Sequence, residues 1–180
     1  CNMPKDRVEA AIKRAMGKDT SNYEEIMYEG YAPHGIAVLV ETATDNPTRT
    51  VANVRMHFTK GQGSLGTSGS VAFGFTHMAE FKIKGAGVNV DDLEFELIDF
   101  GLEEIGEDAD GNIIIRTPFN EYGNMSKALE EKKIEVISAE LTWIPSNTIE
   151  LGEDQANEVL KLVDNLEQDD DVQKVYHNLK

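Results

Sequence analysis

Cysteines, paired histidines and long apolar runs are all scarce in this sequence of 180 residues. A single cysteine, Cys1, excludes an internal disulfide and a zinc site built from several cysteines. The four histidines are scattered and no two lie four residues apart, so we expect no metal site. The longest uninterrupted apolar run covers residues 36–40, far short of the roughly 20 residues that cross a bilayer. These absences predict a protein of the reducing cytoplasm with no membrane partner.

Positive charge is scarce in the second part of the chain, and the formal net charge of the whole is −16. Residues 1–77 carry eight basic and eight acidic side chains, whereas residues 78–180 carry nine basic and 25 acidic ones. Such asymmetry indicates two regions with different partners. The acidic region is either a solubilising surface or a docking surface for a basic protein.

Hydrophobic periodicity and terminating residues predict a mixed α+β chain. Helices are expected at residues 4–16, 47–60, 90–100, 120–132 and 154–166. Strands are expected at residues 25–31, 36–40, 71–75, 79–83, 102–107, 112–117, 135–143, 148–151 and 172–176. Asp45 or Asn46 is expected to cap the helix that begins at Pro47, and Asn120 to cap the helix that follows it.

The order of these elements predicts an insertion. Strand, helix, strand, strand, helix, strand over about 65 residues is the ferredoxin-like βαββαβ arrangement. The strands and helix after Pro145 are too few for a core of their own, so we expect them to complete the sheet begun at residue 25. We therefore predict the end of an N-terminal helical domain at residues 1–20, a central α+β domain at residues 21–77 plus 146–180, and an inserted ferredoxin-like domain at residues 78–145.

A glycine-rich stretch, residues 61–70, is the first candidate site. It contains Gly61-x-Gly63-x-x-Gly66, the string of a dinucleotide-binding fingerprint, but it follows a helix and precedes a strand. The fingerprint requires the reverse order, so that a pyrophosphate meets a helix N-terminus. A phosphate-binding loop is also disfavoured, because Thr67 stands where its lysine would be. Two interpretations stay open, a mobile connector and a backbone contact with a phosphate.

The helix over residues 47–60 is the second candidate. Val51, Val54 and Phe58 share one face, and Arg49 and Lys60 fall on the opposite side. Arg49 lies in the first turn, where a cation opposes the helix dipole by about 0.3–1 kcal/mol, and this suggests a function. With the first helix and the glycine stretch, this helix predicts an electropositive surface for a phosphate backbone. The candidate nucleic-acid-binding residues are Lys5, Arg7, Lys13, Arg14, Arg49, Arg55, Lys60, Gly63, Gly66, Gly69 and Ser70.

No group of residues supports catalysis. Neighbouring carboxylates, as at Asp91-Asp92, point in different directions, and no serine has a histidine base at an interpretable spacing. Phe119 and Trp143 are expected in the core, and the three aspartates at residues 169–171 in a solvated turn. We predict a protein that is not an enzyme, with no catalytic residue, cofactor or small-molecule substrate.

Six blocks of sequence, spread over essentially the whole chain, are informative when they are taken together. They are Asn2-Met3-Pro4-Lys5-Asp6, Tyr28-Glu29-Gly30-Tyr31, Thr44-Asp45-Asn46, Arg49-Thr50, Gly63-x-Leu65-Gly66-x-x-Gly69-Ser70-Val71, and Asp170-Asp171-Val172-Gln173-x-Val175-Tyr176-His177-Asn178. Together they resemble the YebC/PmpR family. The resemblance implies an N-terminal helical bundle, an α+β domain and a ferredoxin-like domain inserted into the second, which agrees with the insertion inferred above.

The resemblance also implies a role in gene expression. Family members are widely described as DNA-binding transcriptional regulators, a mitochondrial relative is a translational activator, and bacterial relatives have been connected with ribosomes. Members normally begin with a basic segment and further helices, so we expect the natural chain to begin before Cys1. The leading expectation is a DNA-binding transcriptional regulator. The alternative is a ribosome-associated translation factor, which the overall acidity favours slightly because a ribosome offers basic proteins as well as RNA.

Overall fold

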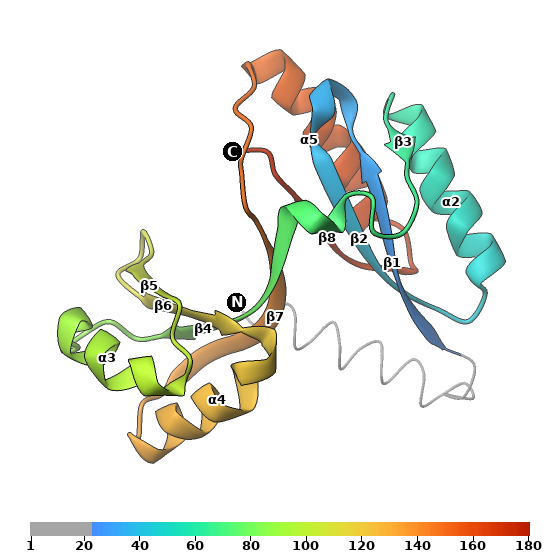
Figure 1. The fold of residues 1–180 in the computed structure, drawn as a ribbon. Helices are drawn as coiled ribbons and strands as arrows, with labels where there is room; N and C mark the ends of the chain where they lie inside the picture. The colour runs from blue at the N-terminus through green and yellow to red at the C-terminus, as the bar shows by residue number, and fades with distance from the viewer. Residues whose placement is uncertain (1–22) are drawn as a thin grey trace. The chain divides into compact units, whose positions relative to one another are not determined.

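The computed structural model describes residues 23–180, which form two compact units (Figure 1). Residues 23–76 together with 145–180 belong to one of them, here called the split unit. Residues 77–144 form the other, here called the continuous unit. Helices and antiparallel sheets occur in both, so the predicted α+β class is confirmed. The helix predicted at residues 4–16 lies outside the described residues, and no helix of residues 23–180 is long and apolar enough to span a membrane.

The split unit contains an antiparallel sheet with the strand order β3-β1-β2-β8. Its elements are β1 (Glu24–Tyr31), η2 (Pro33–Gly35), β2 (Ala37–Thr44), α2 (Pro47–Lys60), β3 (Ser64–Leu65), η3 (Ala72–Gly74), α5 (Glu153–Glu167) and β8 (Val172–His177). β8 pairs with β2, with Tyr176 opposite Leu39. The end of the chain therefore joins the sheet that β1 begins.

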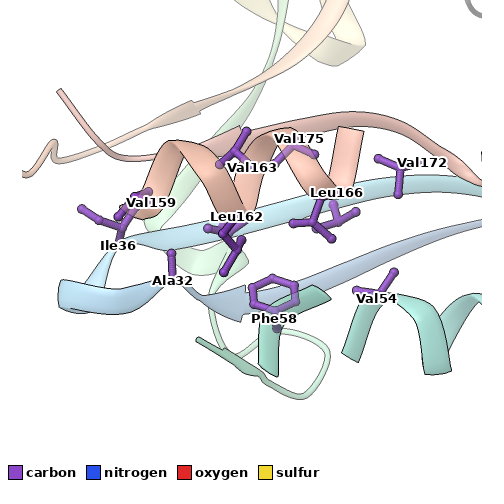
Figure 2. Close-up of a cluster of buried hydrophobic side chains, with 12 residues drawn as sticks. Ala32, Ile36, Val54, Phe58, Val159, Leu162, Val163, Leu166, Val172 and Val175 are labelled. Carbon is purple, nitrogen blue, oxygen red and sulfur yellow. The ribbon is translucent and has the colours of Figure 1, made fainter. Parts of the chain in front are cut away.

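One face of this sheet packs against α2 and α5, and the core of the split unit lies between them (Figure 2). Phe58 of α2 and Leu162 of α5 are fully buried there, together with Val38 and Val40 of β2. Leu39, whose side chain points to the other face, is fully buried as well. The first half of β2 is thus covered on both faces, which explains the continuous apolar sequence of residues 37–40.

The continuous unit has the βαββαβ element order and the strand order β5-β6-β4-β7. Its elements are β4 (Phe75–Ile83), α3 (Val90–Leu97), η4 (Ile98–Phe100), β5 (Glu104–Glu107), β6 (Ile113–Pro118), η5 (Phe119–Glu121), α4 (Tyr122–Glu131) and β7 (Val136–Pro145). Phe81 and Ile115 from the sheet, Leu97 from α3 and Met125 from α4 are buried together. One core therefore joins both helices to one face of this sheet.

Two predicted strands are absent. Residues 71–75 form η3 and only the first residue of β4, Phe75, because the backbone N–H groups at the start of the segment donate to a side chain rather than to a neighbouring strand. Residues 148–151 contribute only an isolated bridge, between Ile149 and Leu179. Both segments are apolar enough to resemble strands, but they lack a partner strand of matching length.

Helix ends were predicted with mixed success. The side chain of Asn46 caps α2 by accepting a hydrogen bond from the backbone N–H of Arg49 at 3.1 Å. Pro47 begins the helix and Gly61 follows its last residue, as predicted. Asn120, in contrast, is not a cap: it lies inside η5, and α4 begins at Tyr122 without a side-chain cap.

Candidate nucleic-acid interface

α2 carries every lysine and arginine of residues 23–76 and has no acidic residue. Its buried side chains are Thr50, Val54 and Phe58, so the helix turns the opposite side to solvent. Lys60 is exposed on that side and Arg55 on its flank, and within residues 23–180 neither side chain has an ion-pair partner. In a chain with a net charge of −16, these two cations are available to a phosphate group.

Arg49, at the start of α2, has partners within the protein. Its guanidinium donates to both carboxylate oxygens of Asp171 at 2.9–3.2 Å and to Asp45 at 3.0 Å. The hydrogen bonds with Asp171, followed by those with Asp45, raise the pKa of Arg49. These two carboxylates explain why a cation is tolerated in the first turn of the helix, so its position there is not a sign of function. The guanidinium of Arg49 is therefore held by Asp171, in the turn before β8.

The aspartates at residues 169–171 do not form a solvated turn, contrary to our prediction. Asp171 is 8% exposed and also accepts a hydrogen bond from the hydroxyl of Thr50 at 2.9 Å. Asp169 lies 3.1 Å from Nε2 of His57, one turn before the end of α2. Only Asp170 is exposed. Two of the three carboxylates therefore fix α2 against the connection between α5 and β8.

Glu29 holds the glycine-rich segment in place. This carboxylate, on β1, is 4% exposed and accepts three backbone hydrogen bonds, from Gly69 at 2.6 Å, Val71 at 3.0 Å and Ala72 at 2.6 Å. Burial on its own would raise the pKa of Glu29, but the three hydrogen bonds together outweigh it and lower the pKa. The segment is thus not an unstructured connector, and these three N–H groups already bind an anion, the protein's own carboxylate.

Close packing accounts for the glycines that begin the segment. A Cβ atom at Gly63 would overlap the carbonyl oxygen of Tyr31, and one at Gly66 would lie 2.7 Å from Oγ of Ser70. Leu65 pairs with Gly30 of β1 between these two points. The string of glycines therefore allows the chain to lie directly on the edge of the sheet, and this requirement needs no bound nucleotide.

The candidate residues fall into three groups. Lys5, Arg7, Lys13 and Arg14 lie outside the described residues. Arg49, Arg55, Lys60 and Gly63 lie on α2 or directly after it, on the helix-covered side of the sheet. Gly66, Gly69 and Ser70 lie by Glu29. The side chain of Glu29 points to the other face, because its neighbour Tyr28 packs on the helix-side core. The glycine-rich segment therefore crosses the edge of the sheet rather than extending the surface of α2.

The continuous unit contains a stack of three rings that includes Phe119 and Trp143, the two residues predicted to lie in the core. The ring of His77 stacks on Phe119 and on Trp143, with centroids 4.4 Å apart in both pairs. Phe119 is 49% exposed, and neither it nor Trp143 belongs to a buried core cluster. Burial lowers the pKa of His77, which favours the neutral ring in the middle of the stack. The core assignment of these two rings is therefore wrong.

Sequence reasoning missed Glu29 and Asp171 as organising carboxylates. Both lie in the six sequence blocks, Glu29 within β1 and Asp171 directly before β8, but no local pattern marks either carboxylate as buried. Among the residues that the structure describes, no cluster of histidine, cysteine or carboxylate side chains could hold a metal ion.

Comparisons with known proteins agree on one family. Residues 23–179 match the family model described as TACO1/YebC second and third domain. A protein of Myxococcus xanthus named "Probable transcriptional regulatory protein" is 58% identical over 182 residues, which cover 99% of this chain and 76% of that protein. A protein of Flavobacterium johnsoniae with the same name is 54% identical, with coverage of 99% and 75%.

A solved structure extends the likeness to three dimensions. The crystal structure of a conserved hypothetical protein from Aquifex aeolicus matches with a TM-score of 0.78 and 36% sequence identity. The match covers 99% of this chain and 74% of that one. Family model, sequence identity and fold thus support the resemblance that the six sequence blocks indicated, and the chain belongs to the TACO1/YebC family.

Proposed function

We propose that this protein is a regulator of gene expression that binds nucleic acid through α2, in the first instance as a DNA-binding transcriptional regulator. The observation that carries the proposal is the solvent face of α2, where Arg55 and Lys60 are exposed and free of ion pairs among residues 23–180. The relatives' name, "Probable transcriptional regulatory protein", supports a role in transcription. A regulator of this kind needs no catalytic residue, and it acts in the cytoplasm that the single cysteine suggests.

Phosphate contact is assigned to cations rather than to the glycine-rich segment. The N–H groups of Gly69, Val71 and Ala72 donate to Glu29, so they are not available to a phosphate oxygen. Lys60 directly precedes the segment, and the packing of Gly63 on β1 fixes the chain just after it. We therefore give the glycines and Ser70 a supporting role. Lys5, Arg7, Lys13 and Arg14 stay predicted contacts that would add positive charge.

A ribosome-associated translation factor is the alternative function. The observation in its favour is the net charge of −16, which repels a bare duplex but suits a particle that presents basic proteins beside RNA. α2 would serve in both cases, because a phosphate backbone is common to DNA and RNA.

Duplex binding and co-sedimentation with ribosomes, measured in one buffer at physiological salt, test this proposal. We expect the protein to bind a promoter duplex in preference to a scrambled duplex and to stay in the supernatant when ribosomes are pelleted. Co-sedimentation that survives an excess of nonspecific DNA, without preference among duplexes, would establish the alternative. Binding to neither target would contradict a role in nucleic-acid recognition.

A further inference from the structure

The outer side of α3 carries a large apolar side chain where an amphipathic helix normally carries polar ones. Leu93 and Leu97 are buried in the core of the continuous unit. Phe95 lies on the opposite side of the helix and is 80% exposed, and Ile98, three residues further, is 56% exposed. An exposed phenylalanine and isoleucine at this spacing form one continuous apolar surface.

Acidic side chains surround this apolar surface. No lysine or arginine occurs in residues 85–115. The exposed carboxylates of α3 and η4 are Asp91, Asp92, Glu94, Glu96 and Asp99. Glu96 pairs with Lys132 of the same unit, and for the other four no cationic partner lies within residues 23–180. The surface therefore combines apolar contact area with negative charge that the described residues do not neutralise.

We propose that α3 and η4 form a docking surface for a basic segment of another protein, one that inserts an apolar side chain beside Phe95 between flanking lysines or arginines. Burial of Phe95 supplies apolar contact area. The carboxylates without a cationic partner orient the basic segment, because opposite charges guide association and exclude wrong partners. The inference is independent of the contact proposed for α2, since its residues lie in the other unit.

Charge argues against the other occupants of this surface. A phosphate backbone would face four unneutralised carboxylates, and the contact would be repulsive. In a symmetric dimer each copy presents the same patch to its partner, so the two acidic helices would oppose each other. A cationic protein segment with one apolar residue satisfies both features of the surface at once.

A labelled synthetic peptide tests the docking surface. The probe is a lysine-rich helical peptide with one central leucine, titrated with the whole chain and followed by fluorescence anisotropy. We expect Phe95→Ala to weaken its binding at least about tenfold, as for a central apolar contact in an interface. Replacing the leucine of the peptide with serine should weaken binding to the unchanged protein to a similar extent.

Phe73→Ala is the matched control, because Phe73 is also 80% exposed but lies in the split unit. Its affinity for the peptide should equal that of the unchanged protein, and both variants should keep the melting temperature, since neither ring is buried. Equal affinities for Phe95→Ala and the unchanged protein, or equal losses in both variants, would overturn the proposal. A dimer that sedimentation detects and Phe95→Ala dissociates would overturn it in favour of self-association.

Discussion

Glu29→Ala is expected to lower the free energy of unfolding by about 3 kcal/mol or more. The substitution leaves the N–H groups of Gly69, Val71 and Ala72 without their acceptor, and hydrogen bonds to a charged group contribute roughly 1.5–3 kcal/mol each. The three donors can recover part of this loss by binding water. Urea denaturation followed by circular dichroism measures the difference.

The matched variant is Glu29→Gln, which keeps the size of the side chain. Its oxygen can accept from two of the three donors, while its amide group opposes the third, so its loss of stability should be intermediate. Because the pKa of Glu29 is lowered in the folded state, its contribution is present above about pH 4.5 and is lost as the pH falls through the folded value. The stability of the unchanged protein should therefore fall more steeply with acid than that of Glu29→Gln. Variants with unchanged stability would show that Glu29 does not hold the segment.

Gly63→Ala is expected to destabilise the protein by about 3 kcal/mol. The new methyl group would overlap the carbonyl oxygen of Tyr31, and a backbone atom in a sheet cannot move aside as a flexible side chain can. The melting temperature, measured by calorimetry, should fall by several degrees, and any loss of nucleic-acid binding should follow the loss of folded protein.

Gly74→Ala provides the comparison, because no atom lies within 4 Å of the position that its Cβ would occupy. This variant should melt within a degree or two of the unchanged protein. A Gly63→Ala protein that melts normally but no longer binds nucleic acid would show that Gly63 is a direct contact. The packing explanation of the glycine-rich segment would then be wrong.

Local sequence signals were sufficient for α2. Asn46 caps the helix, Pro47 starts it and Gly61 terminates it, and all three act within one turn of the residues that they affect. The apolar run of residues 36–40 equally indicated the first half of β2, because a strand segment that is covered on both faces carries apolar residues at successive positions. Signals of this kind need no knowledge of the tertiary structure.

The candidate site depended on contacts that no local pattern records. Glu29 meets Gly69 across 40 residues of sequence, and Asp171 meets Arg49 across 122. Each of these residues looks like a solvated charge or a flexible turn until its partner is known. For this reason Arg49 resembled a free phosphate ligand, and the stretch that begins at Val71 resembled a strand.

The nucleic-acid contact proposed for α2 can be tested without changing Arg49, which is hydrogen-bonded within the protein. Arg55 and Lys60 are the exposed cations of α2 without an ion pair among residues 23–180, so both can neutralise phosphate charge without breaking a contact inside the protein. Their removal should leave the fold intact. The matched control removes two exposed lysines elsewhere in the same unit, Lys161 and Lys180.

The most direct test of the central claim is the salt dependence of duplex binding. Each phosphate contact contributes about 0.9 to the slope of log K against log salt concentration. Relative to the unchanged protein, the double variant Arg55→Ala/Lys60→Ala should have a shallower slope, by the contribution of about two phosphate contacts, and should bind more weakly at low salt. Lys161→Ala/Lys180→Ala should leave the slope unchanged. Equal slopes for the α2 variant and the unchanged protein would contradict the claim that α2 contacts nucleic acid.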